Sequence, residues 1–69
     1  MPEKTLGQFI RKERELLSYT IEEVAKELKV NAATIYHWEH DKKVPNKKHI
    51  RAIANLYCVS VKKLISLIK

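Results

Sequence analysis

Apolar residues recur at helical spacing along almost the whole of this 69-residue chain. They lie three and four positions apart in five short stretches, and no stretch alternates between apolar and polar residues as a half-buried strand does. Glycine occurs once and proline twice, so neither a linker nor a repeat interrupts the pattern. A chain of this length has room for one small core. We therefore predict one all-α domain over residues 1–69, built from five short helices.

Short polar residues mark where four of these helices begin. They are Thr20, Asn31, Asn46 and Ser60. Glu23 follows Thr20 by three positions, which is the pattern of a capping box. The first helix is expected to start near Leu6 and to end near Ser18-Tyr19. The residues expected to face the core share the helical spacing; they are Leu6, Phe9, Ile10, Glu13, Leu16, Leu17, Ile21, Val24, Ala25, Leu28, Ile35, Trp38, Ile50, Ile53, Ala54, Tyr57, Val61, Leu64, Ile65 and Ile68.

Positive charge is concentrated in the second half of the chain. The sequence has 14 Lys and Arg against 8 Asp and Glu, a net charge of +6. The first thirty residues are neutral, and no acidic residue occurs from Lys42 to Arg51. Such a surplus favours an anionic partner, either nucleic acid or a membrane surface. The hydrophobic content of 45% is that of a folding chain and not of a disordered basic tail.

Several other kinds of function are disfavoured by residues that the sequence lacks. A fold this small leaves little room for an enzyme pocket, and a single cysteine, Cys58, excludes an internal disulfide. We interpret Cys58 as a half-buried structural thiol. His37 and His40 have no Cys or third His to complete a metal site, and no apolar run approaches the roughly 18 residues of a membrane span. We expect a cytoplasmic protein with no catalytic site, cofactor or metal.

Residues 20–39 have the organisation of a helix-turn-helix, two short helices joined by a tight turn. Ala25 is small where the helices would cross, and Val30 faces inward from the turn. A helix fits the major groove of DNA. The residues left on the free face of the second helix are Ala32, Ala33, Tyr36 and His37. Because any two capped helices can give this pattern, the spacing alone leaves DNA binding undecided.

The sequence resembles the Cro/C1-type helix-turn-helix family of lambda-repressor-like, xenobiotic-response-element regulators, from Leu6 to about Leu67. The matching residues are Thr20-Ile21-Glu22-Glu23-Val24-Ala25, Leu28, Val30-Asn31, Thr34-Ile35, Trp38-Glu39, Lys42-Lys43, Pro45 and Leu56-Tyr57-Cys58-Val59-Ser60. The resemblance implies a five-helix lambda-repressor-like domain in which the helix Ala32 to Glu39 reads bases. It also implies a sequence-specific regulator of transcription that binds double-stranded DNA, which we expect to be a repressor of bacterial, phage or mobile-element origin.

The same resemblance implies a structural ion pair between Arg14 and Glu39, the alternative being two solvated surface charges. The chain departs from the family pattern at three positions outside the base-reading face. Ile21 replaces a Gln that commonly holds a phosphate, so that contact is expected from backbone N–H groups at the helix N-terminus. Lys29 and Asp41 stand where the family usually has glycine, which adopts left-handed conformations without strain.

Side-chain reach indicates which part of DNA each residue can contact. Ala32 and Ala33 offer only methyl groups to thymine, so hydrogen-bonded recognition of bases falls on Tyr36 and His37. The expected phosphate contacts surround that helix; they are Thr20, Asn31, Thr34, Lys42, Lys43, Lys47 and Lys48.

The sequence leaves two alternatives to base-specific recognition. One is a protein-interaction or accessory DNA-architecture module without strong base readout. The other is membrane-surface binding through the amphipathic stretch from Val61 to Lys69, disfavoured because the core needs that stretch as a lid. A dimer would be required for paired half-sites about 34 Å apart, and its candidate contact is the exposed edge of the last helix around Leu67 and Ile68, unless both only complete the core. Because the chain ends with that helix, we expect no small-molecule effector.

Overall fold

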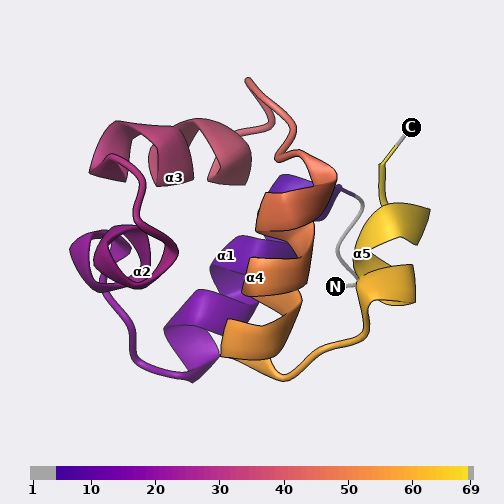
Figure 1. The fold of residues 1–69 in the computed structure, drawn as a ribbon, viewed down its shortest axis with the longest axis horizontal. Helices are drawn as coiled ribbons and strands as arrows, with labels where there is room; N and C mark the ends of the chain where they lie inside the picture. The colour runs from indigo at the N-terminus through magenta and orange to yellow at the C-terminus, as the bar shows by residue number, and fades with distance from the viewer. Residues whose placement is uncertain (1–4, 69) are drawn as a thin grey trace.

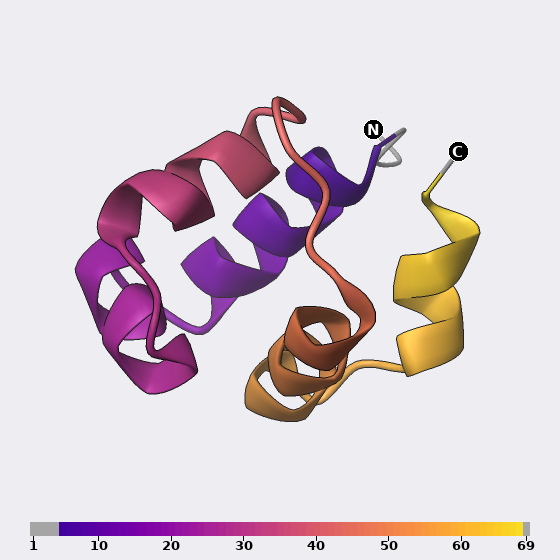
Figure 2. The same cartoon turned by 45° about the horizontal axis from the view of Figure 1, so that its top comes forward.

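The computed structural model describes residues 5–68, which form five α-helices and no strand. The helices are α1 (Leu6–Leu16), α2 (Ile21–Leu28), α3 (Ala32–Glu39), α4 (Lys47–Tyr57) and α5 (Val61–Ser66). α1 and α4 occupy the centre, α2 and α3 lie on one side of them, and α5 lies on the other (Figures 1 and 2). The prediction of an all-α, five-helix fold is confirmed. Within the described residues, no helix is long and apolar enough to cross a membrane.

Each helix begins after a residue with a short polar side chain, as predicted for α2 to α5. The capping box of α2 is complete, because Glu23 N donates to Thr20 Oγ1 (3.1 Å) and Thr20 N donates to a Glu23 carboxylate oxygen (2.8 Å). Ser60 Oγ accepts from the backbone of Lys62 and Lys63. Asn31 does precede α3, but its side chain makes no capping hydrogen bond and is exposed.

Within residues 5–68, four residues other than glycine adopt the left-handed conformation where a helix ends. They are Ser18, Lys29, Asp41 and Cys58. After α2, Lys29 N donates to Lys26 O and Val30 N to Ala25 O, which is the hydrogen-bond pattern of a Schellman motif. The expected strain at Lys29 and Asp41 is therefore present. Cys58 is exposed and not half-buried, because it lies in the left-handed turn that ends α4 and its side chain points away from the core.

The core is formed where the predicted apolar stripes meet. Its buried members are Leu6, Ile10, Val24, Ala25, Ile35, Trp38, Ile50, Ile53, Ala54, Tyr57 and Leu64. Leu16, Leu17 and Ile65 were predicted to join them, and that prediction is wrong. Leu16 is 67% exposed, because α1 ends there and the left-handed Ser18 turns the chain away. In the short α5, Leu64 takes the core position, and Ile65 beside it faces outward.

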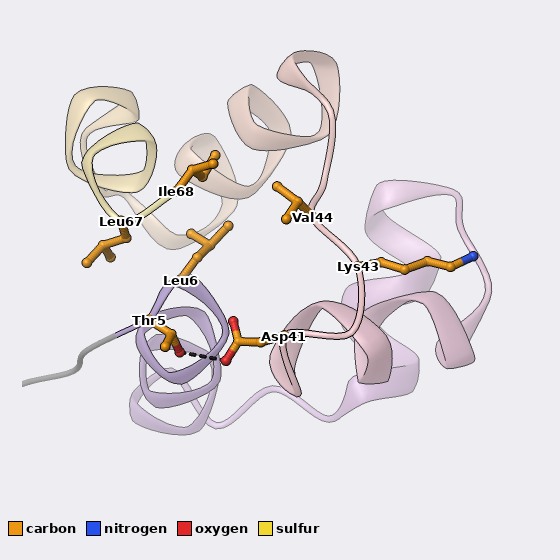
Figure 3. Close-up of a pocket in the computed structure, with 7 residues that line it drawn as sticks. All are labelled: Thr5, Leu6, Asp41, Lys43, Val44, Leu67 and Ile68. Carbon is orange, nitrogen blue, oxygen red and sulfur yellow. Dashed lines mark hydrogen bonds between the residues drawn. The ribbon is translucent and has the colours of Figure 1, made fainter.

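Gly7 lets the start of α1 approach the end of α3 closely. A Cβ atom at this position would lie 2.6 Å from the carbonyl oxygens of Trp38 and Glu39. The Asp41 carboxylate closes the same contact, because it accepts from Gly7 N (2.9 Å) and from Thr5 Oγ1 (2.6 Å). Figure 3 shows the hydrogen bond from Thr5. The segment after α3 is thus fastened to the N-terminus of α1, where a negative charge is also favourable.

Candidate nucleic-acid interface

α2 and α3 pack against each other through the small residue expected at their crossing. Ala25 is buried, and Val30 in the turn is half-buried against the core. Ile35 and Trp38 hold the inner side of α3 on the core. Residues 20–39 therefore have the predicted helix-turn-helix arrangement, with one side of α3 left to solvent.

Arg14 and Glu39 join α1 to the last residue of α3. Arg14 Nε donates to Glu39 Oε2 (2.7 Å) and Nη2 donates to Oε1 (3.1 Å), and Nη1 donates to Tyr19 O (2.9 Å). The exposed fractions of the two side chains are 12% for Arg14 and 1% for Glu39. The hydrogen bond to Glu39 raises the pKa of the Arg14 guanidinium above its ordinary value. The geometry is that of a buried structural pair and not of two solvated charges.

The free face of α3 is formed by three of the four residues expected on it. Ala33 and Tyr36 are exposed and His37 is half-buried. Ala32 packs partly against the core, because it is the first residue after the turn that folds α3 onto α2. It therefore offers less surface to a ligand than the sequence indicated.

An aromatic cluster covers the C-terminal half of this face. The rings of Tyr36 and His40 are stacked, with centroids 3.9 Å apart and planes at 22°. His37 meets Tyr36 edge-on, with centroids 6.0 Å apart. Among residues 5–68, no group of three or more His, Cys, Asp or Glu side chains could hold a metal ion, so His37 and His40 have no further ligand there.

The expected phosphate contacts lie around α3 but differ in accessibility. Lys42 and Lys43 follow α3 on the exposed segment, Lys47 and Lys48 are exposed in the first turn of α4, and Thr34 is half-buried. Lys42 N donates to His37 O (2.9 Å), which ties the start of this basic segment to α3. Figure 3 shows the Lys43 side chain directed away from Leu67 and Ile68.

Electrostatics are less favourable at the start of α2, where Thr20 lies. The first turn of α2 carries Glu22 and Glu23, and both are exposed. Their carboxylates oppose an anion at this helix N-terminus, although the Thr20 hydroxyl hydrogen is free to donate after its oxygen accepts from Glu23 N.

Leu67 and Ile68 do not form an exposed edge of the last helix. α5 ends at Ser66, and both residues are half-buried against the core. They line a cavity of about 260 Å³ together with the apolar Leu6 and Val44 and the polar Thr5, Asp41 and Lys43 (Figure 3). The exposed apolar residue within α5 is Ile65.

Sequence reasoning missed three residues that shape this interface. Gly7 is an isolated glycine in a helical stretch, a signal that often has a packing reason. Asp41 was recognised only as a substitute for glycine, and His40 only as a weak metal candidate. The structure places Gly7 and Asp41 at the contact between α1 and α3, and His40 against Tyr36.

A family model described as a helix-turn-helix domain matches residues 7–69. Two solved structures share the fold. One is the P22 c2 repressor protein in complex with synthetic operator 9T, with a TM-score of 0.85 and 24% identity, covering 90% of this chain and 94% of that chain. The other is SinR, the master regulator for biofilm formation, in complex with DNA, with a TM-score of 0.79 and 22% identity, covering 88% and 98% of the two chains. No curated protein sequence matches significantly.

Proposed function

The chain belongs to this helix-turn-helix domain family, and on that premise we propose that it regulates transcription by placing α3 in the major groove of double-stranded DNA. The observation that carries the proposal is the exposed side of α3 followed, after His40 and Asp41, by the acid-free basic segment from Lys42 to Arg51. Two regulators that share the fold were solved in complex with DNA, and this supports the same use of the fold here.

Base recognition falls on Ala33, Tyr36 and His37. The Ala33 methyl group can contact a thymine methyl group, and the His37 imidazole can donate or accept at a purine edge. The Tyr36 hydroxyl can reach a base edge or the adjacent backbone. Ala32, which packs partly against the core, contributes at most a methyl contact at the rim of the face.

Phosphate binding falls mainly on the segment after α3. Lys42, Lys43, Lys47 and Lys48 supply cations, and Asn31 supplies an exposed amide that takes no part in capping α3. These contacts fix the position of α3 on the duplex without selecting a sequence. Thr20 and Thr34 contribute hydroxyl groups, although the exposed carboxylates in the first turn of α2 weaken an anion contact at Thr20.

We extend the proposal to a repressor that binds paired half-sites as a dimer. The P22 c2 structure, described as a repressor on an operator, favours repression over activation. The candidate apolar surface for pairing near the last helix is the exposed Ile65 with the cavity bordered by Leu67 and Ile68. Leu16, Leu17 and Val44 are exposed apolar residues elsewhere. Sedimentation of this chain on its operator tests the pairing, and a single copy on each duplex contradicts it.

Selection from a random duplex pool tests the proposal as a whole. We expect enrichment of a palindromic sequence and strongly salt-dependent affinity. With about −0.9 for each neutralised phosphate, four lysines give a slope near −3.6 in log affinity against log salt for each copy. Salt-dependent binding without enrichment would indicate an architectural module, and no binding to duplex DNA would sink the proposal. Anionic vesicles serve as the control for charge alone.

A further inference from the structure

We propose that His40 determines specificity by holding the Tyr36 ring in one orientation on the exposed face of α3. His40 acts through Tyr36 and is therefore a positioning residue. The inference rests on the proposed function, since it assigns a role in base recognition to a residue outside the base-contacting set. Three observations carry it, namely the hydrogen bonds of His40, the ring stack, and the rigidity of the turn that follows.

His40 is joined to a single oxygen by one backbone hydrogen bond and one side-chain hydrogen bond. Its backbone N–H donates to Tyr36 O (3.0 Å), and its ring Nδ1 lies 2.9 Å from the same oxygen. A carbonyl oxygen only accepts, so Nδ1 must carry the hydrogen.

The fixed imidazole then sets the plane of the Tyr36 ring. Residues four positions apart share a helix face, and here the rings stack at 3.9 Å with planes 22° apart. An unstacked tyrosine on an exposed helix samples several rotamers, and a duplex would have to select one of them at an entropic cost. Because the stack already holds the Tyr36 ring in the free protein, binding to DNA no longer bears this entropic cost.

The turn beneath the stack is rigid as well. Asp41 holds its left-handed conformation while its carboxylate binds Thr5 and Gly7. Lys42 N donates to His37 O, which closes the helix end. His40 is thus held from both sides along the chain, as a positioning residue requires.

The orientation of Tyr36 matters for discrimination more than for affinity. A phenol held in one orientation makes favourable contacts only with the base pair that fits it. A mobile phenol can adjust to several different base pairs. Loss of the stack should therefore reduce the preference for the correct base pair. A His40 that acted only through contact with a phosphate would instead strengthen binding to every sequence alike.

The test compares the full chain with His40→Leu, which removes the flat ring, and with His40→Phe, which keeps it. The measured quantity is the ratio of affinities for the selected duplex and a scrambled duplex. We expect His40→Leu to lower the ratio about two- to tenfold, the range of an aromatic stack. His40→Phe should restore part of it, because it keeps the stacking ring but lacks the Nδ1 hydrogen bond to Tyr36 O. Lys43→Ala is the matched control, because it should lower the affinity for both duplexes by the same factor.

NMR of the free protein keeps the inference separable from the proposed function. The ring resonances of Tyr36 should be shifted by the neighbouring ring in the parent and in His40→Phe, and should move towards free-tyrosine values in His40→Leu. An unchanged ratio in His40→Leu, an equal loss on both duplexes, or no rescue by His40→Phe overturns the inference. Absence of DNA binding by the parent overturns the proposed function and the specificity role together, although the resonances would still show the stack.

Discussion

Removing one partner of the Arg14–Glu39 pair is expected to lower the free energy of unfolding by about 3–5 kcal/mol. The Glu39 side chain is 1% exposed and that of Arg14 is 12% exposed, so either single substitution leaves a charge buried without its partner. Arg14→Ala should cost at least as much as Glu39→Ala, because the carboxylate is the more deeply buried charge. An apolar double variant, Arg14→Met with Glu39→Leu, should recover most of the loss, since it removes both charges.

Urea denaturation followed by Trp38 fluorescence measures these differences. Trp38 is buried in the core and is the single tryptophan, so its emission reports unfolding of the whole cluster. A loss of about 3 kcal/mol corresponds to a fall in Tm of roughly 12 °C or more for a domain of this size. Because the pair is shielded from solvent, the loss should change little with salt.

An exposed pair elsewhere on α1 gives the matched control. Arg11 Nε lies 3.3 Å from Glu15 Oε2, and both side chains are 55% exposed. Arg11→Ala should therefore cost under about 1 kcal/mol. If Arg14→Ala lowers the free energy of unfolding no more than Arg11→Ala does, or if its effect vanishes in high salt, Arg14 and Glu39 do not form a buried structural ion pair.

Three further substitutions test the account of the fold. Gly7→Ala should destabilise by about 1–3 kcal/mol despite the better helix propensity of alanine, since a Cβ would lie 2.6 Å from the oxygens of Trp38 and Glu39; an unchanged urea midpoint would contradict this. Lys29→Gly should stabilise by about 0.5–1 kcal/mol, because the residue is left-handed with a φ of 58°, and a lower midpoint would count against it. Burial raises the pKa of Tyr57; the folded state therefore keeps the proton while the unfolded tyrosine ionises near pH ~10. Stability that is complete below that pH should decline above it, and a Tyr57→Phe variant with the same alkaline decline would refute this cause.

Helix starts were predictable because capping is a local interaction. Thr20 with Glu23, and Ser60 with Lys62 and Lys63, carry the signal within three positions. Helix ends were less predictable. Ser18 has no special preference for the left-handed conformation that follows α1. Apolar spacing therefore extended the predicted core stripe to Leu16 and Leu17, where the helix ends.

The free face of α3 and the basic segment after it were predictable for the same reason, since each is contiguous in sequence. The Arg14–Glu39 pair spans 25 residues and came from family resemblance, because spacing alone pairs no distant charges. The stack of Tyr36 on His40 depends on side-chain rotamers, and the role of Gly7 depends on how closely α1 meets α3. The spacing of apolar residues along the chain predicts neither the stack nor the close contact at Gly7.

We propose that recognition of sequence and binding of phosphate reside in different residues around α3. The most direct measurement compares His37→Ala with Lys43→Ala on the selected and scrambled duplexes over a range of salt. We expect Lys43→Ala to weaken binding to both duplexes alike and to reduce the salt slope by about one unit. His37→Ala should instead lose about 1–3 kcal/mol of discrimination with an unchanged slope. Equal losses on both duplexes for both variants would contradict the division.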